Sequence, residues 1–248
     1  MQSQETLESG TSRLDLVIAS TETKPVNDHT LVLVHGLPRA LGMGRAAAGM
    51  LPELAEHLAN ESGWQVVSGT LSGVGKSTGT FSASQWLADL SAILDAVSID
   101  DRRVSFAAFG FGGDVALRLA ALDDRVRGVA VFATPADLAV WCGEPESFAA
   151  EVAGAGVVDP SVPLLEPAAL VADVLALDPL GAAATVPPKR FLIGHGSEDS
   201  VVPVSDAKAL QAAADGRAEL RVIHNAGHWL RADPRMVATL LGWLERHR

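Results

Sequence analysis

The stretch Val104 to Ala120 reads VSFAAFGFGGDVALRLA, and it decides the fold. Its first six residues, VSFAAF, form an apolar run of the length expected of a buried strand, whereas DVALRLA has the pattern of a helix. A glycine-rich turn joins the two segments. A sharp turn of this kind can hold up a reactive side chain at its tip, but the residue at the tip is Gly110, which has none.

Similar strands and helices alternate on both sides of this stretch. Because each strand is followed by a helical segment, the pattern predicts parallel βαβ units. The predicted fold class is therefore α/β, with a mostly parallel, doubly wound sheet that carries helices on both faces. The expected strands are residues 30–36, 64–69, 104–109, 125–134, 189–196 and 218–225, and the expected helices are residues 44–63, 83–98, 205–215 and 233–247.

Two segments depart from this alternation. Residues 135–187 are rich in proline and contain one clear helical piece, AALVADVLAL, so they are predicted to form a small lid inserted between two strands. Residues 1–134 and 188–248 then form a single core domain. Residues 1–12 are polar and acidic and are expected to be a loose tail, followed by an edge strand, RLDLVIAS, at residues 13–20.

Composition limits the partners and the compartment. Hydrophobic residues make up 48% of the 248, and charged residues 20%, which is typical of a globular domain. The net charge of −11, from 19 basic and 30 acidic residues, argues against a nucleic-acid partner. No apolar run reaches the roughly 18–20 residues of a membrane span. A single cysteine and the lack of a signal-like start favour the cytoplasm. The sequence gives no indication of the oligomeric state.

Phosphate-loop and metal motifs do not fit. SGVGKST resembles a phosphate-binding loop, but that motif needs a glycine five residues before Gly75, and Thr70 stands there. The seven histidines show no paired spacing, and neither H-E-x-x-H nor C-x-x-C occurs. We therefore expect neither a metal nor another cofactor.

Four features fall after successive predicted strands, at the edge of a parallel sheet where ligands bind. They are the His35-Gly36-Leu37 loop, the Gly110 turn, Asp199 in GSEDSVVP and His228 in NAGHWL. A turn, an acid and a histidine in this order follow the chain order Ser…Asp/Glu…His of α/β-hydrolases.

The sequence thus resembles the α/β-hydrolases over nearly its whole length. LVLVHG is similar to the strand that leads to their oxyanion loop, LSGVGKSTGTFS to their G-x-G-x-S loop, and AFGFGG to their nucleophile elbow. GSEDSVVP resembles the acid loop, and NAGHWL the histidine loop. The resemblance implies a catalytic acid at Asp199, a histidine at His228 and an oxyanion hole made by the backbone N–H groups of Leu37 and Phe111.

The elbow departs from the family pattern G-x-S-x-G. It reads Ala108-Phe109-Gly110-Phe111-Gly112, so the nucleophile position is vacated. Glycine accepts the strained elbow conformation without a Cβ clash, but it cannot form an acyl-enzyme. Asp114 stands about a turn into the next helix and is expected to be exposed or a helix-start charge.

Other side chains could supply chemistry only in principle, or could shape the pocket. Ser72, Ser77, Ser105 and Cys142 are interpreted as structural rather than nucleophilic. His35 is expected to shape the loop that contains Gly36, and Trp141 in the lid either lines a pocket or packs it. The remaining histidines at positions 29, 57, 195, 224 and 247 are expected at the surface or at strand ends.

Three hypotheses of function remain open, and the first is slightly favoured. In the first, the protein is a non-hydrolytic or very weakly active relative of the hydrolases that binds a small apolar or acyl-bearing molecule or a partner. In the second, it is a cofactor-free hydrolase, lyase or isomerase in which His228 and Asp199 act as a general base. In the third, it is an inactivated form of a serine ester hydrolase.

Overall fold

A computed structural model describes residues 1–23, 28–46, 48–98, 102–186 and 189–247. The strands are β1 Gln2–Ser9, β2 Ser12–Ala19, β3 His29–Val34, β4 Gln65–Gly69, β5 Arg103–Phe109, β6 Val126–Phe132, β7 Arg190–Gly196 and β8 Glu219–Ile223. The α-helices are α1 Leu51–Ser62, α2 Ala83–Val97, α3 Gly112–Leu122, α4 Leu138–Cys142, α5 Pro145–Ala155, α6 Pro167–Leu175, α7 Pro179–Thr185, α8 Val204–Ala213 and α9 Pro234–Glu245. Two short 3-10 helices are η1 Met43–Arg45 and η2 Leu230–Ala232.

The strands form one twisted sheet in the order β1-β2-β4-β3-β5-β6-β7-β8. All neighbours from β4 through β8 pair in parallel, whereas β1 with β2 and β2 with β4 are antiparallel. The α/β fold class with a mostly parallel, doubly wound sheet is confirmed. The order reverses between β3 and β5, so the loops after these two strands meet at the carboxyl edge of the sheet.

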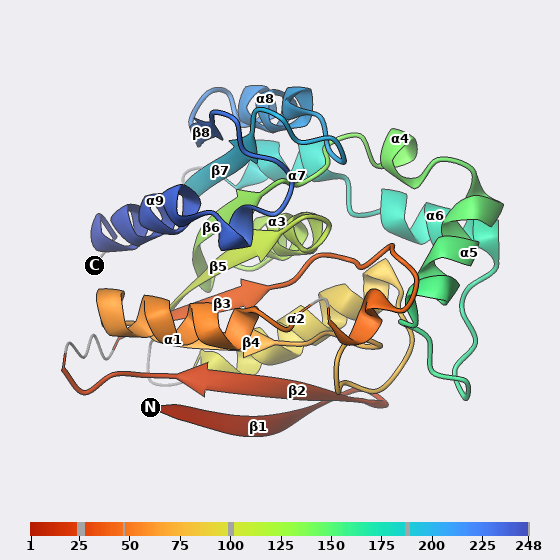
Figure 1. Cartoon of the computed structure of the whole chain (residues 1–248), viewed down its shortest axis with the longest axis horizontal. Coiled ribbons are helices and arrows are strands. Elements are labelled where there is room, and N and C mark those ends of the chain that lie inside the picture. The colour runs from red at the N-terminus through yellow and green to blue at the C-terminus, as the bar shows by residue number, and fades with distance from the viewer. Residues whose placement is uncertain (24–27, 47, 99–101, 187–188, 248) are drawn as a thin grey trace.

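Helices cover both faces of the sheet. Figure 1 shows α1 and α9 side by side on the near face, and α2, α3 and α8 on the far face. The central strands are buried on both faces and read as continuous apolar runs, as parallel strands with two covered faces must. The largest buried side chains include Trp64, Trp86 and Trp243, each about 1% exposed or less. They fix the helices against the sheet.

The prediction of a loose tail at residues 1–12 is wrong. Residues 2–9 form β1, which pairs with β2 from Gln2 opposite Ala19 to Ser9 opposite Ser12. β1 is therefore the edge strand, and β2 lies one position further in. The side chains of β1 are mostly exposed, so no apolar alternation marks the strand. The hairpin is anchored from its turn, where the buried Ser9 Oγ donates a hydrogen bond to Asp89 Oδ1 on α2 at 2.7 Å.

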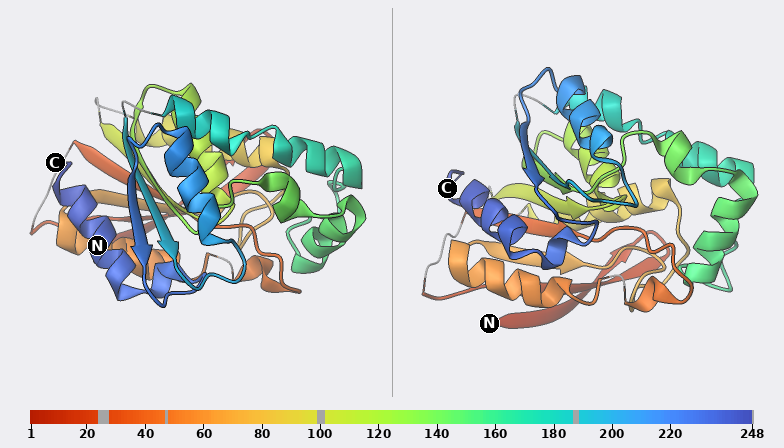
Figure 2. Two further views of the ribbon diagram at one scale, coloured as in Figure 1. Left: turned by 90° about the horizontal axis from the view of Figure 1, so that it is seen from above. Right: turned by 45° about the horizontal axis from the view of Figure 1, so that its top comes forward.

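The inserted segment divides into two parts. Helices α4, α5 and α6 gather beyond the carboxyl ends of the strands, at one end of the molecule (Figures 1 and 2). Helix α7 instead packs against α3 and α8 in the helical layer of the far face. The predicted boundary at residues 187 and 188 lies outside the described residues.

One described stretch has the length and composition of a membrane span. Residues 167–185 have a mean hydropathy of 1.5, and a third of the stretch is buried in the fold. The structure breaks this stretch into α6 and α7, and composition alone is weak evidence for a span.

Candidate functional site

The turn at residue 110 has the geometry of a nucleophile elbow. Gly110 follows β5 directly and adopts a left-handed backbone conformation with φ of +54°. Its amide donates to the carbonyl oxygen of Phe132 at 2.8 Å, and its own carbonyl accepts from the amide of Gly113, the second residue of α3. A Cβ placed on Gly110 would lie 3.7 Å from Gly36 Cα and 4.0 Å from His228 Nε2. The position is thus open and faces the histidine.

His228 and Asp199 come together as the sequence predicts for an acid–histidine pair. His228 lies in the loop after β8, and Asp199 in the loop after β7. His228 Nδ1 is 2.8 Å from Asp199 Oδ2, which leaves Nε2 directed toward Gly110. The side chain of Asp199 is fully buried, whereas that of His228 is 22% exposed. The histidine can therefore exchange protons with a ligand while the acid holds its ring.

Asp199 is held as a carboxylate. Burial alone would raise its pKa, but the hydrogen bonds from His228 and from the amides of Val202 and Val201 outweigh burial, and the pKa is lowered. A carboxylate on Nδ1 keeps the proton there and leaves Nε2 as the proton acceptor. The pair is therefore arranged as a general base toward the space above Gly110.

His195 supports Asp199 from behind and was expected at a strand end. It lies at the end of β7 but is completely buried. Its Nε2 is 2.9 Å from the carbonyl oxygen of Val202 and 3.5 Å from Asp199 Oδ2. Because a carbonyl can only accept, Nε2 carries the proton and ties the acid loop to the strand. The sequence analysis expected this histidine at the surface or at a strand end; it is at a strand end, but the helices and loops around β7 bury it completely.

Two backbone amides form the candidate oxyanion hole. Leu37 follows β3, and Phe111 follows the elbow; both residues line the same cavity as Gly110. Among the hydrogen bonds of the described residues, none is donated by the amide of either one. Free N–H groups beside a histidine are the donors that stabilise a developing oxyanion. Gly110 leaves both of these amides in place.

His35 holds the loop that carries Gly36 and Leu37, and it does not line this cavity. Its Nδ1 is 2.9 Å from the carbonyl oxygen of Gly36, and its Nε2 accepts from the amide of Leu71 at 3.0 Å. Burial lowers the pKa of His35 to about 4. The neutral ring therefore donates on one side and accepts on the other, and it joins the loops after β3 and β4.

A cavity of about 330 Å³ lies above these groups. It reaches from Gly110 and His228 to Trp141 on α4 and Met43 on η1, and most of its lining is apolar. Its walls are formed by Gly36, Leu37, Pro38, Arg39, Ala40, Met43, Phe109, Gly110, Phe111, Phe132, Trp141, Val201, Val202, His228, Trp229, Leu230 and Arg231. Volume and lining are those of a site for a small, largely apolar molecule.

Trp141 on α4 packs against the turn at Gly110. Its ring stacks on Phe111 with the centroids 5.0 Å apart and the planes 3° from parallel. Arg39, in the loop after β3, lies over the Trp141 ring at 4.9 Å and donates to the Trp141 carbonyl oxygen at 2.6 Å. Arg39 also pairs with Glu151 on α5 at 2.7 Å. Helices α4 and α5, the loop after β3 and the turn at Gly110 therefore pack together as one wall of the cavity.

Arg231 is a cavity residue that the sequence analysis missed. It lies in η2, three residues after His228, and its guanidinium is 4.7 Å from the centroid of Trp229. Its Nε is buried without a hydrogen-bond partner among the described residues. An arginine in a loop gives no signal in sequence. Arg231 lines the cavity because the chain turns after His228 and brings η2 to the carboxyl ends of the strands.

Asp114 is buried, contrary to the expectation of an exposed helix-start charge. Its side chain is inaccessible, and neither carboxyl oxygen has a hydrogen-bond partner within the described part of the chain. Burial raises the pKa of Asp114 well above its ordinary value, and the charge of Asp206 raises it further. Asp114 does not line the cavity. The glycine-rich elbow places this first turn of α3 inside the core rather than at the surface.

The alternative nucleophiles are not placed for attack. Cys142 ends α4, and burial raises the pKa of its thiol to about 11, so the thiol stays protonated. Ser72 is buried in the loop after β4, Ser77 Oγ donates to the carbonyl oxygen of Thr70, and Ser105 stands at the start of β5. Within the described residues, no group of three or more His, Cys, Asp or Glu side chains could hold a metal ion.

Comparison with solved structures identifies the fold. The α/β hydrolase GrgF from Penicillium sp. sh18 superposes with a TM-score of 0.72 at 16% identity, over 100% of this chain and 99% of that one. The esterase domain of a Rhodothermus marinus protein gives 0.70 at 17% identity, over 100% and 97%. An α/β serine hydrolase homologue from Coxiella burnetii gives 0.66 at 19% identity, over 99% and 96%. The chain has the α/β-hydrolase fold.

Sequence comparison adds no closer assignment. No protein-family model matches the chain, and no curated protein matches it. At these identities the structural similarity shows the fold alone, so the chemistry must be argued from the site of this chain.

Proposed function

We propose that the cavity above Gly110 binds a small, largely apolar molecule with an acyl or carbonyl group, and that the protein forms no acyl-enzyme with it. The absence of a side chain at the elbow supports this proposal. Covalent catalysis needs a nucleophile at that position, and the nearest alternatives are buried or protonated. The carbonyl oxygen would lie against the amides of Leu37 and Phe111, and the apolar part against Phe132 and Trp141.

A second candidate function rests on the contact between His228 and Asp199. Their 2.8 Å separation and the aim of Nε2 toward Gly110 give the pair the geometry of a general base. The space that Gly110 leaves free can hold a water molecule or a C–H group of a ligand. The base would then act on that water or carbon acid directly, and the two amides would stabilise the oxyanion or enolate that forms.

Binding is tested with a homologous series of methyl ketones. Trp141 and Trp229 both line the cavity, so intrinsic fluorescence reports occupancy. Affinity should rise by about 0.8 kcal/mol for each added CH₂ until the cavity is full. Ala40→Trp, at an exposed position of the cavity wall, should block binding without disturbing the core. Ketones that fail to bind, or that bind the blocked variant equally well, would contradict the proposal.

Turnover separates the two candidates. The parent protein and the His228→Ala variant are each incubated with p-nitrophenyl butyrate. The release of nitrophenol and the intact mass of each protein are measured over time. We expect neither a burst nor an acyl adduct. Slow steady turnover that disappears in His228→Ala supports the general base, and ketone binding without turnover supports a pure binding function. A burst of about one equivalent with a matching acyl adduct would overturn both.

A further inference from the structure

A second cavity, of about 350 Å³, lies at the opposite edge of the sheet from Gly110. It is bordered by the amino ends of β3, β5, β6 and β7 and by residues that follow α1 and α9. Four cationic side chains line it: Arg103, Arg127, Lys189 and Arg190. They are four of the 19 lysines and arginines of a chain with a net charge of −11. Four cationic side chains around one cavity are unexpected in so acidic a protein, which suggests that the cavity holds an anion.

The parallel sheet brings these cations together. Arg103 begins β5, Arg127 is the second residue of β6, and Arg190 begins β7. These three strands are neighbours, and Arg190 pairs in register with Gly128, directly after Arg127. Lys189 precedes Arg190. Residues that are far apart in sequence thus form a row across three adjacent strand starts, and among the described residues no carboxylate lines the cavity.

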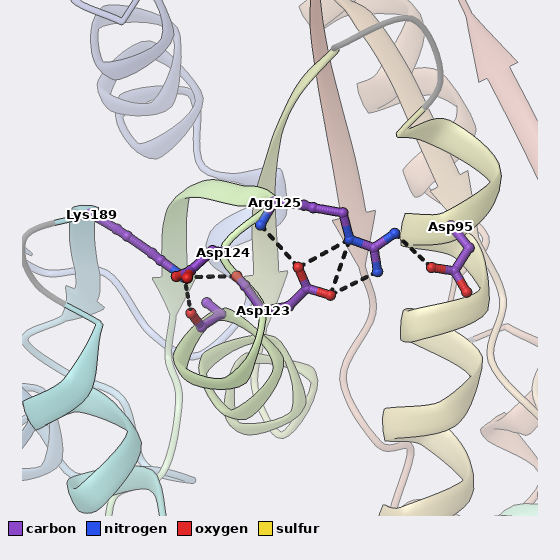
Figure 3. A network of polar contacts seen from close by, with 6 residues as sticks. Asp95, Asp123, Asp124, Arg125 and Lys189 are labelled. Atoms are coloured by element: carbon purple, nitrogen blue, oxygen red, sulfur yellow. Dashed lines mark hydrogen bonds and ion pairs between the residues drawn. The ribbon is translucent and has the colours of Figure 1, made fainter.

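Two of the four cations have partners. Lys189 Nζ donates to the carbonyl oxygens of Ala120 and Asp123 at 2.6 and 2.7 Å and lies 3.3 Å from the exposed Asp124 (Figure 3). Arg103 Nε is 3.8 Å from Asp28 Oδ2. Lys189 is therefore fixed by the fold, while Arg103 has only a long contact.

Arg127 and Arg190 remain available. Neither guanidinium makes an ion pair or a hydrogen bond with the described residues of the chain. Burial, and next the positive charge of Arg190, lower the pKa of His247 on the same cavity wall. Arg127 and Arg190 thus place two positive charges on the cavity lining without an ion-pair partner among the described residues.

An uncompensated hydrogen-bond donor lies on the same wall. Trp64 is 1% exposed, and its Nε1 has no partner among the described residues. His247 Nδ1 is also buried and without a partner within that part of the chain. A buried indole N–H without an acceptor costs free energy. Both nitrogens lie behind the cavity surface, so the groups left to contact a ligand are the cationic side chains of the lining.

We propose that this cavity binds a small phosphate-bearing anion, held by the guanidinium groups of Arg127 and Arg190. Guanidinium groups present paired N–H donors that match phosphate oxygens. Several cationic side chains around one cavity favour a ligand with more than one negative charge, and the volume accommodates a pyrophosphate group. The site is separate from the cavity above Gly110 and does not depend on the function proposed for it.

The test is calorimetric titration of the whole protein with pyrophosphate at constant ionic strength. Citrate serves as a carboxylate probe of comparable charge. We expect saturable binding of pyrophosphate that is tighter than that of citrate. Arg127→Gln and Arg190→Gln should each weaken it about 10-fold or more.

Two controls make the result decisive. Arg13→Gln removes the same charge from an exposed position on β2, past the carboxyl end of β4 and so at the opposite ends of the strands from the cavity. It should leave the affinity unchanged. His228→Ala, in the first cavity, should also leave it unchanged. Equal weakening by Arg13→Gln would show that only net charge matters and would overturn the site. Absent binding, or citrate binding as tightly as pyrophosphate, would overturn the proposed ligand class.

Discussion

Gly110 differs from the neighbouring glycines of the elbow in the space around it. A Cβ on Gly110 would meet only Gly36 and His228, at ordinary van der Waals distances. A Cβ on Gly112 would overlap the carbonyl oxygen of His35, and one on Gly113 would overlap Thr134 Oγ1. The packing therefore requires glycine at positions 112 and 113. At position 110 there is room for a side chain.

We expect Gly110→Ser to create an ester hydrolase. A serine Cβ 4.0 Å from His228 Nε2 would bring the hydroxyl within hydrogen-bonding reach of the histidine, beside two free amides. Hydrolysis of p-nitrophenyl butyrate should then rise roughly 100-fold or more over the parent chain and show a burst. The double variant Gly110→Ser with His228→Ala should lose this gain. A folded Gly110→Ser protein without turnover would mean that the two amides or the histidine are not aligned.

A pair of alanine variants tests the packing of the elbow. Gly110→Ala should reduce the free energy of unfolding by about 1–2 kcal/mol, because φ of +54° is unfavourable for a residue with a Cβ. Gly112→Ala should cost about 3 kcal/mol, since the backbone must move to relieve the overlap. Urea unfolding measures both. An equal cost for the two variants would contradict the difference in space that the structure shows.

Sequence reasoning finds some single residues and misses others for a physical reason. Asp199 and His228 can be found because each follows a recognisable strand, and the structure joins them at 2.8 Å. Asp114 and Arg231 cannot, because burial of a polar side chain depends on what packs over it. The elbow turns Asp114 into the core, and η2 brings Arg231 to the cavity wall.

At the scale of elements, strand prediction depends on apolar residues. β3, β5, β6 and β7 are apolar runs and were predicted close to their observed bounds. β1 reads QSQETLES and has no apolar face, because its side chains point mainly into solvent. Its order comes from backbone pairing with β2 and from contacts at the hairpin turn. Such a strand is defined by its partner and not by its own pattern.

Asp89 on α2 secures this hairpin, and its removal should be costly. The buried carboxylate accepts from Ser9 Oγ at 2.7 Å, from the amide of Ser72 at 2.7 Å and from Gln85 Nε2 at 2.8 Å. We expect Asp89→Ala to reduce the free energy of unfolding by about 3 kcal/mol, since buried donors lose their acceptor. Hydrogen exchange should show faster exchange of the β1 amides. Ser84→Ala, at an exposed position one turn earlier on α2, is the matched control and should change the stability little.

For the whole molecule, stability should depend on pH through two carboxyl groups with opposite shifts. The pKa of Asp114 is raised in the folded state, so its contribution is fully present below about 3.8 and is lost as the pH rises through the folded pKa. The pKa of Asp199 is lowered, so its contribution is present above 3.8 and is lost as the pH falls through the folded pKa. The two effects occupy separate pH ranges.

Asp114→Asn isolates the first effect. Asparagine does not titrate, so the variant lacks the loss that the parent chain suffers as the pH rises. The unfolding free energy of the variant minus that of the parent chain should therefore be larger at pH 8 than at pH 4. Urea unfolding at both values measures it. A difference that stays constant with pH would show that Asp114 ionises in the folded protein as easily as in the unfolded one.

The two cavities at opposite edges of the sheet show what sequence can convey about the molecule. The first is recognisable because ligands bind beyond the carboxyl ends of parallel strands, so the loops there deserve inspection. The second gathers Arg103, Arg127 and Arg190 from strand starts that are 24 or more residues apart. The sequence has no local run of basic residues that would predict this second cavity. The strand order alone places these residues side by side.

The polar edge strand β1 affects how readily the protein associates with itself at high concentration. An outermost strand presents a row of unpaired backbone N–H and C=O groups, which another chain could extend into a shared sheet. Glu5 and Glu8 stand on that strand, and its side chains are almost all hydrophilic. At the far edge, β8 carries Glu219 and Arg221, and Glu219 is bridged to Arg246 of the C-terminal segment. Both edges of the sheet thus carry charged side chains, which disfavour the addition of a strand from another copy of the chain.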